Sequence, residues 1–242
     1  MPTLSLDTLF RIPVACSFGS ANKETASQLT PLAPGEEPEN YHSWVEKRQR
    51  EYRAGRHHAR LALSRAGYPS GSILRDKEGV PLFPGGFKGS ISHTGTSSTF
   101  ALAVVALGAH QVGVDVELRR SLSPEMIQHI VSSAERTHWQ THATSLFDRE
   151  EQIALLAFCA KEAFYKCTYP IHRTFLSFHD VSFELTEYLP CLNGKDEGVG
   201  SFSIRLLKQD SADVPRKLPG RFIVTTEYII CGVDWDAKVP TD

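Results

Sequence analysis

One long apolar segment, DREEQIALLAFCAKEAFYKCTY at residues 148–169, constrains the fold more than any other part of this chain. Its apolar side chains recur at helical spacing and surround most of the helix, which is typical of a helix that other elements cover on several sides. Asp148 is placed to cap its start. We therefore predict a buried helix, and the rest of the chain has to supply the surfaces that cover it.

The other apolar segments have the residue spacing of β-strands. TFALAVVAL (99–107) and QVGVDVEL (111–118) are rich in β-branched residues, and the turn at Gly108 predicts that they form a hairpin. Alternating segments at 180–185, 201–207 and 221–235 predict antiparallel strands in the second half of the chain. Residues 20–40 lack a periodic pattern and are expected to form a surface loop.

Further helices are expected in both halves of the chain. Apolar residues at helical spacing over 41–66 predict an amphipathic helix with a basic flank, and Ser123, before Pro124 and Glu125, is a typical helix start. The predicted fold class is α+β, with two similar α/β halves arranged as a pseudo-dimer, each a mostly antiparallel sheet packed on a long helix. We expect an N-terminal subdomain at residues 1–118, a C-terminal subdomain at 119–242 and the active site in the cleft between them.

The overall charge argues against partners that are bound through a field of one sign. Lysine and arginine number 26 against 28 aspartate and glutamate, for a net charge of −2, which disfavours nucleic acid and acidic membranes. The five cysteines are odd in number and include no C-x-x-C pair, as expected in a reducing compartment. No run approaches the roughly 18 apolar residues of a membrane span, so a soluble cytoplasmic protein is expected.

Acidic residues interrupt two of these apolar segments. Asp115 and Glu117 lie two apart on a predicted strand and so point to the same side, where two carboxylates form an oxygen-rich site suited to Mg²⁺. The alternative is that they are solvated surface charges. Glu162 and Lys166 stand one turn apart on the long helix, either as an ordinary ion pair or as a third carboxylate beside a cation for phosphate. The apolar character of this helix favours the second interpretation.

Polar and basic segments precede these carboxylates. In GSISHTG (89–95) glycines flank Ser92, His93 and Thr94 in a predicted loop that suits a phosphate or diphosphate, although a histidine that only satisfies a turn is the alternative. KRQREYRAGRHHAR (47–60) is either a local anion site or a solvated basic face, and Arg75 with Lys77 extends the same charge.

The motifs GSISHTG, GVDVE and FCAKEAFYK, in this order, resemble those of the 4′-phosphopantetheinyl transferases. The chain is similar to the monomeric, two-subdomain type that serves siderophore, polyketide and nonribosomal peptide carrier proteins, and the resemblance spans roughly residues 47–185. It implies coenzyme A as donor substrate and Mg²⁺ as metal, with Mn²⁺ as the alternative. It also implies a serine of an apo acyl or peptidyl carrier protein as acceptor and 3′,5′-ADP as the second product.

Roles follow from this resemblance position by position. Asp115 and Glu117 would bind the metal, with Glu162 as a third ligand or as the base that accepts the serine proton. The expected contacts to coenzyme A come from Lys166 at the diphosphate, from His93 with Ser92 at the phosphates, and from basic residues around the nucleotide and its 3′-phosphate: Arg48, Arg56, Arg75 and, less directly matched, Arg53 and Arg60. Lys77 is expected to add its charge to the same site because it lies beside Arg75. Phe158 and Ala163 stand where many relatives have tryptophan and serine, and neither change removes a charge.

Two other functions use the same residues. A Mg²⁺-dependent phosphohydrolase of a nucleotide or of coenzyme A would employ the carboxylates, His93 and the arginines with water as the acceptor. A nucleotide-binding adaptor would need the basic residues alone. Label from coenzyme A appearing on a carrier protein distinguishes the transferase from both.

Overall fold

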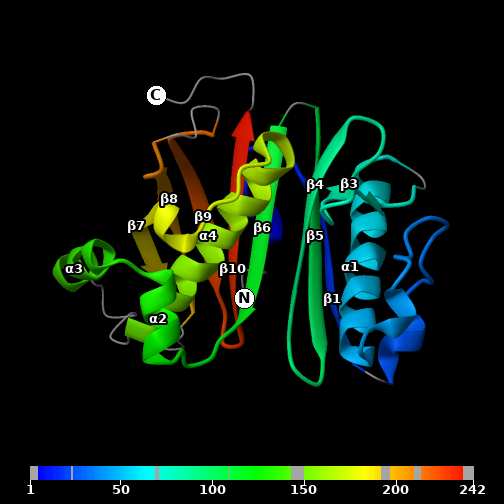
Figure 1. Ribbon diagram of the computed structural model, residues 1–242, viewed down its shortest axis with the longest axis horizontal. Helices are drawn as coiled ribbons and strands as arrows, with labels where there is room; N and C mark the ends of the chain where they lie inside the picture. Colours follow the sequence, from blue (N-terminus) through cyan, green and yellow to red (C-terminus); the bar gives the residue numbers. More distant parts are fainter. Residues whose placement is uncertain are drawn as a thin grey trace.

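The computed structural model describes residues 5–22, 24–68, 71–108, 110–142, 150–191, 197–209 and 214–236, without the side chains of 140–142. The fold is α+β, and two antiparallel sheets lie beside one another (Figure 1). The first sheet has the order β1-β5-β4, formed by β1 (Ala15–Ala21), β4 (Phe87–Thr94) and β5 (Thr99–Leu107). Helix α1 (Glu46–Arg65) covers it, and β2 (Leu74–Arg75) pairs with β3 (Pro81–Leu82) in a small separate sheet. Short 3₁₀ turns occur at Leu6–Leu9, Thr25–Gln28 and Tyr41–Ser43.

The second sheet has the order β6-β10-β9-β8-β7 and belongs to the second half of the chain. Its strands are β6 (His110–Leu118), β7 (Val181–Pro190), β8 (Gly198–Leu206), β9 (Lys217–Val224) and β10 (Tyr228–Asp236). The long helix α4 (Glu150–His172) packs on it, mainly against β6 and β10, while α2 (Pro124–Ile130) and α3 (Ser133–His142) lie at its outer end (Figure 1). A 3₁₀ turn at Phe178–Asp180 precedes β7. The prediction of two similar halves, each an antiparallel sheet on a long helix, is therefore confirmed.

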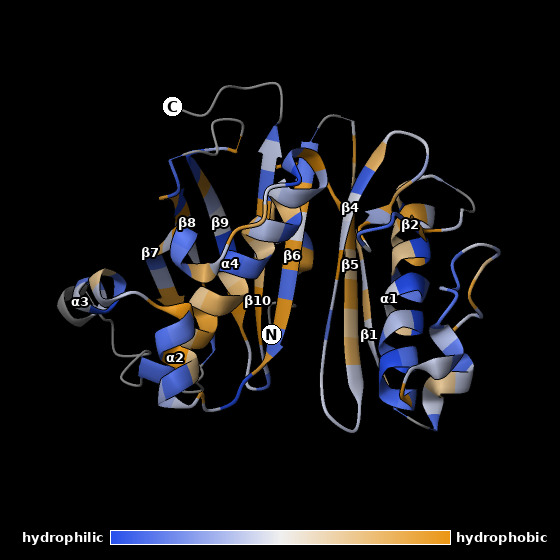
Figure 2. Cartoon of the chain, in the orientation of Figure 1, coloured by the Kyte–Doolittle hydropathy of each residue, from blue (hydrophilic) through white to orange (hydrophobic). Residues whose placement is uncertain are grey.

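The apolar character of α4 explains its position. Ile153, Leu155, Leu156 and Phe164 are fully or almost fully buried in a core shared with α2 and the second sheet. Helix α1 shows a different pattern, because its first half is strongly hydrophilic whereas β5 and β6 are mostly hydrophobic (Figure 2). Only one face of α1 packs on its sheet, so polar side chains can occupy the rest of the helix.

The hairpin predicted for 99–107 and 111–118 is wrong, although both strands exist at the expected places. β5 pairs with β4 and β1, and β6 pairs with β10 in the other sheet. Because β6 belongs to the second sheet, the two sheets separate between Leu107 and His110. A short glycine turn gives a hairpin when the two strands that it connects pair with each other. Here the two strands enter different sheets, which the turn itself does not reveal.

Side-chain hydroxyl groups join the edge strands β4 and β6 of the two sheets. Ser90 Oγ accepts a hydrogen bond from the Val114 amide at 3.0 Å, and Ser92 Oγ accepts one from the Val116 amide at 3.2 Å. Thr94 Oγ1 accepts the next one, from the Leu118 amide at 3.2 Å. This hydroxyl ladder satisfies buried amide groups that would otherwise lack partners, and it fixes the register of the two halves. Ser92, His93 and Thr94 thus lie in strand β4 and not in the loop that was expected.

Other expectations differ in detail. The predicted helix over 41–66 begins only at Glu46, after a 3₁₀ turn, and the predicted strand at 221–235 is divided into β9 and β10 by a turn near Thr225. Ser123 caps α2 as expected, since its side chain accepts a bond from the Met126 amide. The proposed cap Asp148 lies outside the described residues. Among the helices that the structure describes, none has the length and apolar composition needed to cross a bilayer.

Candidate active site

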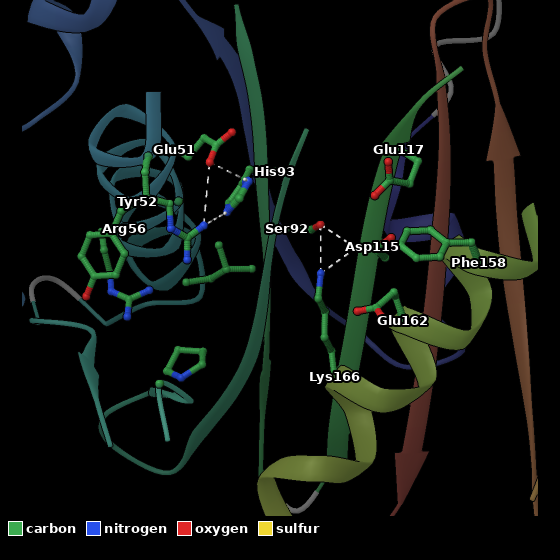
Figure 3. A pocket seen from close by; sticks show the side chains of 15 residues that line it. Glu51, Tyr52, Arg56, Ser92, His93, Asp115, Glu117, Phe158, Glu162 and Lys166 are labelled. Atoms are coloured by element: carbon green, nitrogen blue, oxygen red, sulfur yellow. Dashed lines mark hydrogen bonds and ion pairs between the residues drawn. The ribbon is translucent and has the colours of Figure 1, made fainter. Parts of the chain in front are cut away.

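A cavity of about 410 Å³ opens between the two halves, at the level of the hydroxyl ladder (Figure 3). One wall comes from α1, from β4 and from the segment around β3, and the other from β6 and α4. The first wall carries two arginines, and the second wall carries three carboxylates and one lysine. The lining residues are Arg48, Glu51, Tyr52, Gly55, Arg56, Gly79, Pro81, Ile91, Ser92, His93, Asp115, Glu117, Phe158, Glu162 and Lys166.

Asp115, Ser92 and Lys166 form a closed triangle at the floor of this cavity (Figure 3). Lys166 Nζ donates to Asp115 Oδ1 at 2.6 Å and to Ser92 Oγ at 3.0 Å, and Ser92 Oγ donates to Asp115 Oδ1 at 2.8 Å. Burial lowers the pKa of Lys166, but the attraction and hydrogen bond of Asp115, together with the charge of Glu162, outweigh it and raise the pKa. Lys166 is therefore a fixed cation, and it pairs with Asp115 rather than with Glu162, its neighbour on the helix.

The carboxylates around this triangle carry more negative charge than the protein neutralises. Asp115 is 3 % exposed, and its Oδ2 atom is buried without a hydrogen-bond partner. Burial, with the charge of Asp115 next in importance, raises the pKa of Glu117 to about 7. Burial also raises the pKa of Glu162, with Lys166 opposing and Asp115 adding to the shift. An unpartnered oxygen flanked by two more carboxylates suits a hard divalent cation.

These carboxylates do not form a preassembled metal cage. No group of at least three His, Cys, Asp or Glu side chains in the described parts of the chain is close enough together to hold a metal ion by itself. Mg²⁺ is usually held by one or two protein carboxylates, with water and substrate phosphates as the remaining ligands. The residues present therefore fit Mg²⁺ that is bound together with a phosphorylated substrate.

His93 faces the cavity from β4 as a neutral imidazole. Burial, followed by the nearby charges of Lys166 and Arg48, lowers the pKa of His93 to about 4. Arg48 Nη1 lies 3.3 Å from His93 Nε2, and because a guanidinium group only donates, Nε2 must be the acceptor and Nδ1 carries the proton. Glu51 Oε2 is 3.9 Å from that Nδ1 atom.

Only some of the predicted arginines lie at the cavity. Arg48 and Arg56 line the cavity; Arg56 is 5 % exposed, its guanidinium group lies 4.5 Å from the Tyr52 ring, and its Nε atom is buried without a partner. Arg75 is exposed on β2, 6.0 Å from the Trp44 ring, and Lys77 is exposed in the following turn. Arg53 lies apart from the cavity, because its Nη2 atom donates to the carbonyl groups of Ala26 and Leu29.

Arg60 is also committed to the protein itself, through an ion pair with the buried Glu36. Arg53 and Arg60 belong to the basic segment 47–60, but they tie α1 to the chain before it. They were distinguished from Arg48 and Arg56 only by position in the family motif. Their partners are backbone carbonyls and Glu36, which leave no signal in the local sequence.

Sequence reasoning missed several residues that shape the site. Tyr52 and Glu51 lie on the cavity face of α1, and their spacing from Arg48 and Arg56 on one helix could have indicated this. Lys161, directly before Glu162, is 2 % exposed and forms an ion pair with the buried Glu135 at 2.8 Å. Its ammonium group also donates to the carbonyl groups of Ile130 and Phe178, both at 2.9 Å, and so anchors α4.

A surface contact closes the cavity on the side of the β2–β3 turn. Arg173, at the end of α4, forms ion pairs with Asp76 and with Glu78, the second at 2.9 Å. Tyr169 donates to Glu78 at 3.3 Å. These contacts hold the turn that contributes Gly79 and Pro81 to the cavity against the second half of the chain.

Comparison with known proteins agrees with this geometry. Residues 37–106 match the family described as the 4′-phosphopantetheinyl transferase N-terminal domain, and residues 111–213 match the 4′-phosphopantetheinyl transferase superfamily. These two matches separate at the same point of the chain as the two sheets.

Relatives with known names extend the comparison over most of the chain. The 4′-phosphopantetheinyl transferase Npt of Nocardia iowensis is 30 % identical over 197 residues, covering 78 % of this chain and 83 % of Npt. The 4′-phosphopantetheinyl transferase Svp of Streptomyces mobaraensis is 30 % identical over 206 residues, which are 84 % of this chain and 76 % of Svp. The 4′-phosphopantetheinyl transferase PptT of Mycobacterium tuberculosis is 36 % identical over 162 residues, which are 64 % and 66 % of the two chains. The chain therefore belongs to the 4′-phosphopantetheinyl transferase superfamily and is an enzyme of that class.

Proposed function

We propose that this cavity transfers the 4′-phosphopantetheine group of coenzyme A to a serine of an apo acyl or peptidyl carrier protein, with release of 3′,5′-ADP and in dependence on Mg²⁺. One observation carries the proposal: the buried Asp115 and the half-buried Glu117 and Glu162 face the guanidinium groups of Arg48 and Arg56 across a single cavity. Coenzyme A has the matching chemistry, because its nucleotide carries a single 3′-phosphate and a diphosphate, and the bond to be broken lies within that diphosphate.

The α1 wall supplies groups that suit the nucleotide end of the donor. Arg56 presents a buried Nε without a partner, and Arg48 is held near His93. A guanidinium fork can donate two hydrogen bonds to one phosphate at once. Arg75 and Lys77 extend the same basic edge, whereas the bonds of Arg53 make it a support of α1 in this proposal.

Three carboxylates are the proposed metal-binding residues, namely Asp115, Glu117 and Glu162. Mg²⁺, or Mn²⁺ in its place, would supply charge that lowers the repulsion between an incoming oxygen and the diphosphate and that stabilises the leaving group. The free oxygen of Asp115 and the raised pKa of Glu117 support this assignment, since Asp115 Oδ2 lacks a donor and burial beside Asp115 disfavours the Glu117 anion unless a cation joins it.

The chain's own groups perform the remaining work. Lys166 and Ser92 bond the other oxygen of Asp115 and so keep Oδ2 free for a ligand. Glu162 is the proposed acceptor of the serine proton, and its raised pKa makes it a better base than an exposed carboxylate. The serine oxygen then forms its bond to the phosphorus atom next to the pantetheine arm while the bond from that phosphorus to the 3′,5′-ADP oxygen breaks.

The cellular compartment and the oligomeric state belong to the same proposal. All five cysteines are free thiols, which supports a reducing compartment such as the cytoplasm. The two halves of a single chain supply both the arginine wall and the carboxylate wall of the cavity, so the proposed enzyme acts as a monomer.

The test is the intact mass of an apo carrier protein incubated with this enzyme, coenzyme A and Mg²⁺. We expect the carrier to gain one phosphopantetheine, and a carrier whose acceptor serine is replaced by alanine to gain nothing. Chelation of the metal should abolish the gain. If coenzyme A is instead cleaved to free phosphopantetheine, the phosphohydrolase is the correct function, and if coenzyme A only binds, the adaptor is.

A further inference from the structure

Trp44, which directly precedes α1, contacts arginines from two separate elements. The guanidinium carbon of Arg48, on α1, lies 5.5 Å from the centre of the Trp44 ring. That of Arg75, on β2, lies 6.0 Å from the same ring. Both distances are within the range of cation–π attraction, for which tryptophan is the best ring. Trp44 is thus the common contact of two cations that come from distant parts of the sequence.

The Trp44 ring is itself held in place by its neighbours. Tyr41 and Tyr52 make edge-on contacts with it, at centroid distances of 5.6 and 5.4 Å. Its carbonyl oxygen accepts a bond from Gln49 Nε2 at 2.8 Å. Tyr52 in turn lies beneath Arg56 and donates from its hydroxyl to a backbone carbonyl. The aromatic cluster of Tyr41, Trp44 and Tyr52 therefore positions three guanidinium groups.

Aromatic rings hold these arginines where carboxylates would be the usual partners. Within the described part of the chain, neither Arg56 nor Arg75 forms an ion pair, and Arg48 has only Glu51 at 3.8 Å. Burial lowers the pKa of Arg56, and the charge of Arg75 lowers it further, so the two cations repel one another. Contact with a ring occupies the flat face of a guanidinium group and leaves its N–H edge free for an anion.

We propose that Trp44 is a positioning residue that holds Arg48 and Arg75 as a preformed site for the phosphate on the 3′-oxygen of the ribose of coenzyme A. The inference rests on the proposed function and adds to it the residue that sets selectivity for the 3′-phosphorylated donor. Arg48 links this site to the cavity, which it lines. A phosphate dianion between Arg48 and Arg75 can accept charge-assisted hydrogen bonds from both guanidinium groups.

The test compares binding of 3′,5′-ADP with binding of 5′-AMP, which differ only by the 3′-phosphate, by calorimetry. We expect Trp44→Leu to weaken 3′,5′-ADP about tenfold, equivalent to about 1.4 kcal/mol, and to leave 5′-AMP unchanged. Trp44→Phe keeps an aromatic face, so its affinity for 3′,5′-ADP should lie between that of the native protein and that of Trp44→Leu. Arg65→Gln, on the same helix but bonded to the carbonyl of Cys16, is the matched control and should bind both nucleotides like the native protein. Equal weakening of both nucleotides would overturn the inference, because it would mean that Trp44 contacts the base.

A second variant keeps the inference testable if Trp44→Leu folds poorly. Arg75 is exposed, so Arg75→Gln should fold normally and lose affinity for 3′,5′-ADP alone. Where both variants fold, the double variant should lose less than the sum of the single losses, and additive losses would refute positioning by the ring. An enzyme that modifies a carrier without preferring 3′,5′-ADP to 5′-AMP refutes this inference alone. An enzyme that binds 3′,5′-ADP more tightly than 5′-AMP but modifies no carrier refutes the proposed function alone.

Discussion

Replacement of Ser92 by alanine separates the structural role of the hydroxyl ladder from the chemical role of the cavity. Ser90 and Ser92 occupy equivalent places in that ladder, and each accepts a hydrogen bond from an amide of β6. Only Ser92 also donates to Asp115 and accepts from Lys166. Ser90→Ala is therefore a matched control that removes the ladder bond and nothing from the carboxylate site.

The expected magnitudes follow from these contacts. Each alanine leaves one buried amide, that of Val114 or Val116, without its acceptor, which costs about 1–3 kcal/mol of unfolding free energy. Both variants should therefore be destabilised, Ser92→Ala more than Ser90→Ala because it also loses its bonds to Asp115 and Lys166. Ser92→Ala also removes two hydrogen bonds to charged groups, each worth about 1.5–3 kcal/mol. Loss of one such bond from the transition state lowers kcat/KM about 10- to 100-fold.

The assay pairs urea unfolding of both variants with the rate of carrier modification. We expect a loss of stability in both variants, larger for Ser92→Ala, with a normal rate for Ser90→Ala and a strongly reduced rate for folded Ser92→Ala. Equal rates for the two variants, whether both normal or both reduced, would refute the reasoning, because the bonds of Ser92 to Asp115 and Lys166 would then have no special part in catalysis.

Three further predictions concern single groups. Lys161→Met should lower the free energy of unfolding in urea by about 3–5 kcal/mol, because it leaves Glu135 buried without its cation. Adding Glu135→Met should recover part of that loss. A loss below about 1 kcal/mol for Lys161→Met contradicts the role given to this pair. Burial, followed by the charges of His57 and Arg65, holds the pKa of His58 at about 4, below its ordinary 6.5. The stability that the neutral ring contributes is therefore present above pH 6.5 and is lost as the pH falls toward 4. Between pH 7 and 5 the native protein should lose about 2 kcal/mol more than His58→Gln does, and parallel pH profiles would show that the ring titrates normally. Glu162→Gln should lower kcat about 100-fold or more, and native turnover with intact Mg²⁺ affinity would rule out both roles proposed for Glu162.

The sequence predicted those parts of the fold that depend on local pattern. The long apolar helix was visible because its side chains are apolar around most of the helix, and α4 is buried as that pattern requires. β5 and β6 were visible from their β-branched residues, but their partners were not. Strand pairing depends on which other strand buries the same edge, and a short connection does not decide it.

The same division holds for the candidate site. Asp115, Glu117, Glu162 and Lys166 were found because charge stands out within apolar segments, and the structure brings them to one cavity. The pairing of Lys166 with Asp115 instead of Glu162 was not predictable, because it depends on how α4 packs across β6. Nor were the internal partners of Arg53, since the carbonyl groups that it binds carry no side-chain signal.

The most direct test of the central claim is the rate at which Asp115→Asn modifies an apo carrier, followed by intact mass. Asp234→Asn is the matched control, because Asp234 is an equally buried aspartate of the neighbouring strand whose partner is Arg11. The account predicts that Asp115→Asn loses at least 100-fold in rate while it remains folded, and that Asp234→Asn transfers at the native rate. Native transfer by Asp115→Asn would contradict the account, since the carboxylates of this cavity would then not be the groups that support the reaction.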